Sequence, residues 1–225
     1  MAQTEQKNQN VKKQFEELQS LLERAMALQT SMVLFEWDDE TLAPKGAAEH
    51  TARVIGSLSE QYQEILASMR FKELLDACQK AEKENAGVFD EVQSAILREA
   101  AEEQERLSCI PPEEYRAYAE LTARATGIWT RAREKNDFAS FAPVLKEIIS
   151  YQKKFAAYRA KPGQKLYDVM LDTYEKGFNM EMLDPFFELM KGKIVPLLKE
   201  SAERSKTVPD AFLSADYPEA AQAEA

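Results

Sequence analysis

Apolar residues recur at helical spacing along most of this chain, and this repetition limits the fold more than any other feature. The first run contains Phe15, Leu18, Leu22 and Ala25, which fall on one side of a helix with about 3.6 residues per turn. Only 7 of the 225 residues are glycine, and Ala and Glu far outnumber the β-branched residues, which favours helix over strand. The sequence therefore predicts an all-α fold of antiparallel helices joined by short loops.

The ends of the periodic runs give the expected helix boundaries. The first helix should run from Val11 into the segment Glu36–Thr41, where Pro44 and Gly46 break the pattern. Further helices are expected over residues 46–68, 72–84, 87–108, 112–136, 141–160 and 180–204, with a helical turn at 167–173. We see no internal repeat and no linker, so we expect residues 1–225 to form a single helical lobe.

Two polar residues are placed to cap helices, and one segment stands out at the end of the chain. Ser140 and Asn179 each precede a periodic run and are expected as N-caps, with Pro143 in the first turn of its helix. Residues 218–225 begin as a helix would, with proline, an acid and alanines, but no C-cap follows. We interpret the sequence as ending inside an element.

The charge of the chain argues against two classes of partner. The formal net charge is −10 and the isoelectric point is about 4.9, so phosphate backbones and anionic lipid headgroups would be repelled. Basic residues gather only around Lys153, Lys154 and Arg159 to Lys161, and we interpret them as a solvated helix face and not as a binding patch. We expect no nucleic acid and no membrane as partners.

The cysteines and the N-terminus indicate a location. Cys78 and Cys109 follow no metal-ligand spacing, and two thiols cannot staple a chain of this length. The first fifteen residues are polar and contain no apolar signal core. We therefore expect a cytoplasmic protein.

The residues that could carry chemistry are few. His50 is the one histidine, whereas a zinc hydrolase helix of the HExxH type needs two imidazoles one turn apart. A surface or packing role for His50 is the better interpretation, and a nucleophile–histidine pair would have no other base available. We predict no catalytic residue, no metal ligand and no cofactor for this chain.

Two groups of carboxylates are candidates for metal sites. Asp38, Asp39 and Glu40 are expected in a loop, where oxygen ligands could hold a hard cation, but their spacing does not fit an EF-hand and we favour a structural role. The run that includes Glu99 and Glu103 lacks the Glu-x-x-His motifs of di-iron bundles. We interpret that run as a solvated face.

One long stretch resembles a known family. Leu28 to Glu60 reads LQTSMVLFEWDDETLAPKGAAEHTARVIGSLSE, which looks like the opening of the Taq-type thermostable metallocarboxypeptidases. The matching residues are Trp37, Asp38, Glu40, Thr41, Pro44, Gly46, Ala47 and Ala48. The resemblance continues in order through residues 110–156, 166–198 and 208–222, so it spans nearly the whole chain.

The resemblance implies a larger, mostly helical fold, often dimeric, that removes C-terminal amino acids from peptide substrates. In that family an HExxH helix and a downstream glutamate hold zinc or another divalent metal, and those motifs have no counterpart in this sequence. No catalytic or metal residue can therefore be carried over. The matched segment corresponds to N-terminal helices beside the substrate groove, so Trp37, Asp38 and Thr41 are the candidates for groove lining, beside the structural role that we favour for them.

Two hypotheses remain open from the sequence. The first is the N-terminal part of a metal-dependent carboxypeptidase, inactive on its own. The second is a free-standing helical interaction module that kept the scaffold without catalysis, which would need a partner to cover its exposed apolar surface. Self-association into a homo-oligomer is a further expectation, because half of a core would otherwise face water.

Overall fold

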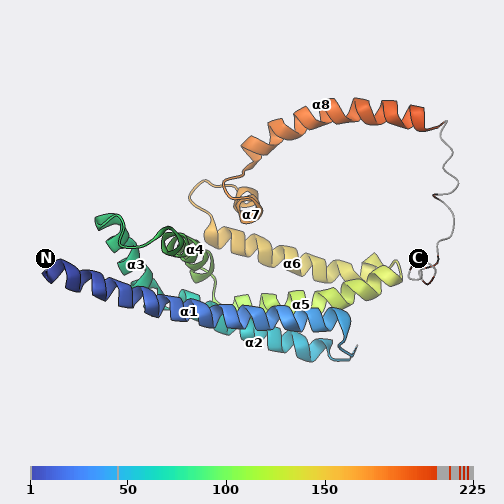
Figure 1. Ribbon diagram of the computed structural model, residues 1–225. Helices are drawn as coiled ribbons and strands as arrows, with labels where there is room; N and C mark the ends of the chain where they lie inside the picture. The colour runs from blue at the N-terminus through green and yellow to red at the C-terminus, as the bar shows by residue number, and fades with distance from the viewer. Residues whose placement is uncertain are drawn as a thin grey trace. The chain divides into compact units, whose positions relative to one another are not determined.

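The fold is built from helices throughout the part of the chain that the structure describes. The computed structural model describes residues 2–44 and 46–206, together with residues 213, 218, 220 and 222. Within this part the longer elements are eight helices and no strand occurs (Figure 1), which confirms the all-α prediction. They are α1 (Ala2–Thr41), α2 (Ala48–Ala67), α3 (Met69–Glu84), α4 (Glu91–Ser108), α5 (Pro112–Glu134), α6 (Phe138–Arg159), α7 (Leu166–Tyr174) and α8 (Met180–Ser205).

The chain divides into two compact units, which we describe separately. The first is Met1–Gly163 and contains α1 to α6, and the second is Gln164–Ala225 and contains α7 and α8. Gly163 adopts a φ of +82°, a left-handed conformation that glycine reaches without a Cβ penalty. A single lobe over residues 1–225 stays a prediction. The expected helix start within residues 218–225 lies largely outside the described residues.

Helix α2 is the centre of the first unit, because it packs against α1 on one side and against α5 on another (Figure 1). Helix α3 packs on α1, α4 on α2 and α3, and α6 on α5. The largest fully buried side chains include Leu18 of α1, Leu66 of α2, Phe71 and Leu74 of α3, and Leu97 and Leu107 of α4. The core therefore lies where α1 to α4 meet, and α5 and α6 extend the layer on the far side of α2.

A buried amide ties the turn between α4 and α5 to α2. Gln63 has no exposed surface, and its Nε2 donates to the carbonyls of Leu107 at 3.1 Å and Ile110 at 2.5 Å. These carbonyls belong to the end of α4 and the turn after it, where the Leu107 carbonyl also accepts from the Ile110 backbone N–H at 3.1 Å. Gln63 thus adds side-chain donors at this helix end and ties the turn before α5 to α2.

Several helix starts differ from the sequence prediction: α3 begins at Met69 and α4 at Glu91, where residues 72 and 87 were expected. Helix α1 begins at Ala2 and not at Val11. Residues 2–10 carry no apolar stripe, so the sequence pattern could not predict that they are helical. Asp137, and not Ser140, caps α6: its carboxylate accepts from the Ser140 backbone N–H at 3.2 Å. Pro143 consequently lies inside α6 and beyond the first turn.

The second unit is held by side chains that bind backbone donors. Asn179 accepts from the backbone N–H of Met182 at 3.1 Å, which confirms it as the N-cap of α8. Asp168 of α7 accepts from the Met180 N–H at 2.9 Å, so a second residue satisfies the first turn of α8. Asp172 accepts from Gly177 N–H at 2.8 Å in the connecting turn. These bonds fix how α7 leads into α8.

At Gly56, α2 lies against the Glu120 side chain of α5. A Cβ at this position would lie 2.3 Å from Cγ of Glu120, whereas a Cβ at Gly127 of α5 would meet only the Arg131 guanidinium at 3.5 Å. The Glu120 side chain crosses Gly56 to accept from Arg116 Nε at 3.0 Å, and Arg116 Nη1 also donates to Glu60 at 2.9 Å. The missing Cβ therefore makes room for the ion-pair network between the two helices.

The two glycines should respond in opposite directions to alanine. Gly56→Ala should lower the free energy of unfolding by about 1–2 kcal/mol, because Glu120 must move out of a packed interface. Gly127→Ala should raise it by about 0.5–1 kcal/mol, because alanine has the higher helix propensity and meets no close atom there. Urea unfolding of both variants measures these changes in the free energy of unfolding, provided that the m-values equal that of the parent. Equal stabilisation by both substitutions would contradict the close approach.

Candidate functional site

The conspicuous acidic segment lies on the last turns of α1. The sequence placed Asp38, Asp39 and Glu40 in a loop, and this prediction is wrong, because α1 continues to Thr41. Thr41 Oγ1 donates to the carbonyl of Trp37 at 2.6 Å, and the backbone N–H groups of residues 42 and 43 both donate to the Asp38 carbonyl. These bonds satisfy carbonyls of the last turn and keep the carboxylates on a rigid helix.

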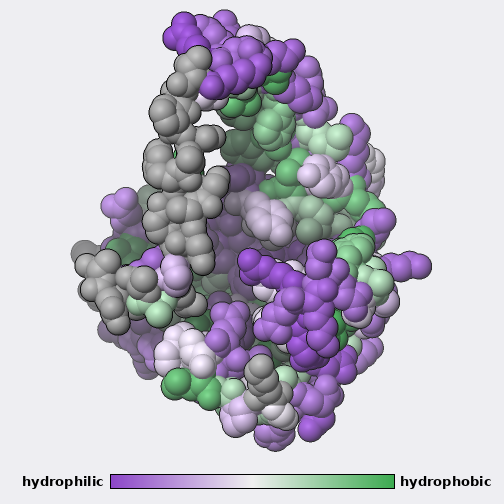
Figure 2. All heavy atoms as spheres, turned by 90° about the vertical axis from the view of Figure 1, so that its right-hand side faces the viewer, coloured by the Kyte–Doolittle hydropathy of each residue, from purple (hydrophilic) through white to green (hydrophobic). Residues whose placement is uncertain are grey.

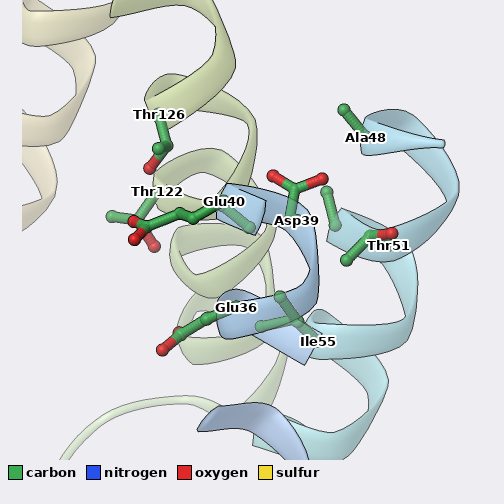
Figure 3. A pocket seen from close by; sticks show the side chains of 10 residues that line it. Glu36, Asp39, Glu40, Ala48, Thr51, Ile55, Thr122 and Thr126 are labelled. Atoms are coloured by element: carbon green, nitrogen blue, oxygen red, sulfur yellow. The ribbon is translucent and has the colours of Figure 1, made fainter. Parts of the chain in front are cut away.

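A cavity of about 260 Å³ opens where this end of α1 faces α2 and α5. Its lining residues are Glu36, Asp39 and Glu40 from α1, Ala48, Thr51, Ala52 and Ile55 from α2, and Thr122, Ala123 and Thr126 from α5. Figure 3 shows the side chains of Glu36 and Glu40 extending toward α5, while Asp39 lies nearer to α2. Three carboxylates and the two helices opposite them thus enclose a small acidic hollow.

The residues that the sequence selected as groove lining lie on the other sides of the same helix end. Trp37, Asp38 and Thr41 do not line the cavity, and all three are exposed, Trp37 by 56%. The cavity is instead lined by their neighbours Glu36 and Glu40, which lie one helical turn apart on the side of α1 that faces the cavity. The signal for this was the four-residue spacing of the two glutamates, which places them on one face. A role of Trp37, Asp38 and Thr41 in lining a groove stays a prediction.

The acids of the cavity have no cation to balance them within the described residues. Nearby Glu49 is within 3.5 Å of Arg53 and 3.8 Å of Arg124, but among the residues that the structure describes no ion pair involves Glu36, Asp39 or Glu40. The cavity can therefore accept hydrogen bonds and attract positive charge. It offers no donor set for a metal: among the residues described, no group of three or more His, Cys, Asp or Glu side chains converges on a common point.

The remaining candidates for chemistry are held in unreactive settings. His50 is exposed in the first turn of α2. Cys78 is fully buried, and burial raises the pKa of its thiol to about 11, so it stays protonated at neutral pH. Burial also raises the pKa of Tyr62, whose hydroxyl donates to Glu103 at 3.0 Å. None of these groups is poised to act as a nucleophile or a base.

Two stretches interpreted as solvated faces contain residues that tie helices together. Glu103 accepts from Tyr62 and pairs with Arg106, so one member of the glutamate run links α4 to α2. Arg159 at the end of α6 donates from Nε to the Arg106 carbonyl at 3.1 Å, and its pKa is lowered, chiefly by burial and then by the charge of Arg106. Both interactions are structural, and for Glu103 and Arg159 the solvated-face interpretation is wrong.

Comparison with known proteins places this helical scaffold in a class of peptidases. Residues 17–225 match the model of the carboxypeptidase Taq (M32) metallopeptidase family. The chain belongs to this family. Carboxypeptidase 1 of Bacillus subtilis is 32% identical over 204 residues, which cover 91% of this chain and 40% of the relative. Thermostable carboxypeptidase 1 of Pyrococcus furiosus is 31% identical over 183 residues, which cover 81% of this chain and 36% of the relative.

Solved structures confirm the fold over the same extent. The crystal structure of BsuCP superimposes with a TM-score of 0.87 at 31% identity, covering 94% of this chain and 42% of that chain. Metallocarboxypeptidase 1 of Trypanosoma cruzi gives a TM-score of 0.70 at 26% identity, covering 92% and 40%. The chain thus spans about 40% of the length of its relatives. In the described part of the chain, no helix has the length and apolarity needed to cross a membrane.

Proposed function

We propose that this chain forms the N-terminal helical part of a metal-dependent carboxypeptidase and contributes a wall of its substrate groove. The observation that carries this proposal is the family match over residues 17–225 together with a superposition of TM-score 0.87 onto a carboxypeptidase. Zinc or another divalent metal, and the peptide substrate whose C-terminal residue is removed, belong to the complete fold.

The residues present do not fit the metal that the family implies. A tetrahedral hydrolase site needs about three converging nitrogen or oxygen ligands, but the one histidine is exposed and the acids of the cavity diverge toward different helices (Figure 3). No catalytic step can be assigned to side chains of this chain. We therefore propose that the chain alone neither binds metal stoichiometrically nor cleaves peptides.

Trp37, Asp38 and Thr41 are the residues that we propose to face the groove. Their side chains are exposed at the end of α1, where a rigid helix holds them beside the acidic cavity lined by Glu36 and Glu40. An exposed indole offers a large apolar surface to a peptide side chain, and the uncompensated acids favour positively charged substrates. A cytoplasmic location is proposed on the two unpaired thiols, Cys78 and Cys109.

A chimera tests the proposed function. The residues of Bacillus subtilis carboxypeptidase 1 that align with this chain are replaced by the chain itself, and release of C-terminal amino acids from a model peptide is measured with and without added Zn²⁺ or Co²⁺. We expect the chimera to be active with metal and the isolated chain to be inactive, because the scaffold is shared and the metal site lies in the relative's part.

Two results would contradict this proposal. Metal-dependent release of amino acids by the isolated chain would show that it carries its own catalytic site. A chimera that folds with a normal thermal transition but has no activity would favour the second hypothesis, a helical interaction module that kept only the scaffold. The exposed apolar surface of α8 is the observation on which that alternative depends. The parent Bacillus enzyme, assayed beside the chimera, is the positive control.

The role of Trp37 can be measured in the same chimera. Trp37→Ala should raise KM by about three- to tenfold with little change in kcat, because a lost aromatic contact of about 1 kcal/mol weakens ground-state and transition-state binding alike. Trp129→Ala is the matched control: Trp129 is also exposed and stacks under Arg133 on α5, away from the cavity lining. An equal rise in KM for both variants, or none for Trp37→Ala, would remove Trp37 from the groove.

A further inference from the structure

A small cluster of polar side chains lies in the first unit, where the end of α4 meets the start of α5 and the end of α6. Glu103 is at its centre: one carboxylate oxygen accepts from the Tyr62 hydroxyl at 3.0 Å, and the other pairs with Arg106. Arg159 reaches the cluster from α6, where its Nε donates to the Arg106 carbonyl at 3.1 Å. Tyr115, near the start of α5, belongs to the same cluster. Burial and then the charge of Glu103 raise the pKa of its hydroxyl, whereas the charges of Arg106 and Arg159 lower it.

The cluster contains more hydrogen-bond donors than acceptors. The bond from Arg159 to the end of α4 is the kind of contact by which an arginine satisfies a helix C-terminus, but it uses one of the five N–H groups of the guanidinium. Within the described part of the chain, the other four N–H groups of this half-buried side chain and the Tyr115 hydroxyl have no partner. Glu103, the carboxylate at the centre, already accepts from two other side chains. The remaining donors therefore call for an acceptor from outside the cluster.

The charge of the cluster leads to the same conclusion. Two guanidinium groups surround one carboxylate, so the cluster carries one positive charge in excess. Burial and the charge of Arg106 lower the pKa of Arg159 by more than the charges of Cys109 and Glu103 raise it. This excess occurs in an acidic chain, with 39 Asp and Glu against 29 Lys and Arg, and hydrophilic side chains (purple) cover much of the face in Figure 2. A positive charge held partly out of water is stabilised by an anion beside it.

We propose that Arg159 and Tyr115, with Arg106 beside them, bind the carboxylate group of a ligand. A guanidinium presents its N–H groups in a planar fork that matches the two oxygens of a carboxylate, and the Tyr115 hydroxyl supplies a further donor. A carboxylate carries one negative charge and so neutralises the cluster. A phosphate monoester, with nearly two charges at neutral pH, would leave negative charge in excess beside Glu103.

This site is separate from the acidic cavity at the end of α1. None of Arg106, Tyr115 and Arg159 lines that cavity. The inference goes beyond the proposed function, because binding of a carboxylate is measured without any peptidase activity. Its failure would leave the assignment of a carboxypeptidase intact, and an inactive chimera would leave this site intact.

An NMR titration of the whole chain tests the site, with sodium acetate as the probe and sodium chloride at equal ionic strength as the comparison. We expect the ¹H–¹⁵N signal of the Arg159 Nε–H group to shift saturably with acetate and not with chloride, because other N–H groups of the same guanidinium bind the carboxylate. A second titration with acetyl-alanyl-alanine identifies the source of the carboxylate. Tighter binding than that of acetate assigns the site to a peptide C-terminus, and equal or weaker binding assigns it to a small carboxylic acid.

Tyr115→Phe separates binding from a purely structural role. The substitution removes a hydroxyl that has no partner in the described part of the chain, so the Tm should stay unchanged while the dissociation constant of acetate rises about three- to tenfold. Tyr151→Phe is the matched control. The Tyr151 ring packs on Tyr118 with the centroids 5.7 Å apart, and its hydroxyl is likewise without a hydrogen-bond partner among the described residues. This control should change neither quantity.

Three results would overturn the proposal. Equal shifts with acetate and with chloride would show that the salts only screen the charges of the cluster. The same dissociation constant in Tyr115→Phe and in the parent would exclude the hydroxyl from the site and leave Arg159 with the role of a helix cap. The absence of any saturable shift would mean that no free carboxylate binds there.

Discussion

The packing of α2 between α1 and α5 is the constraint on which the first unit depends. It requires a helix that can be covered on two sides, and the sequence meets this with a buried face that includes Ala52, Ile55 and Leu66 and with Gly56 where the Glu120 side chain crosses α2. Gln63, on the same helix, holds the turn between α4 and α5. Because α1, α2 and α5 also enclose the acidic cavity, the site has the geometry that this packing imposes.

Sequence periodicity predicted most of the helices, because burial of an apolar stripe leaves a repeat that can be read without neighbours. It missed the start of α1, where residues 2–10 carry no stripe, and it placed Asp38, Asp39 and Glu40 in a loop although the helix continues through them. A proline and a glycine downstream show that a helix must end, but not at which residue. Asp137 was missed as the N-cap of α6 for a different reason: Ser140, three residues later, is an equally good capping residue by type.

The sequence singled out a segment, and the structure shows which of its side chains line the cavity. The residues Glu36 to Thr41 could be selected from their composition and from the family resemblance, but the direction in which each side chain points depends on where α2 and α5 lie. Trp37 is therefore outside the cavity and Glu36 inside it. Helix α8 shows the converse: its apolar residues are clear in the sequence, whereas the structure shows that none of the residues it describes in this helix is buried.

Amide hydrogen exchange of the isolated chain tests this account most directly, because it reports the stability of each helix separately. The account predicts strong protection of α2 and of the helices packed against it, with protection that disappears together as denaturant is added. It predicts weaker protection along α8, which has no buried residue among those the structure describes. Protection of α8 as strong as that of α2 would contradict the account, because α2 would then not be the most stable helix of the chain.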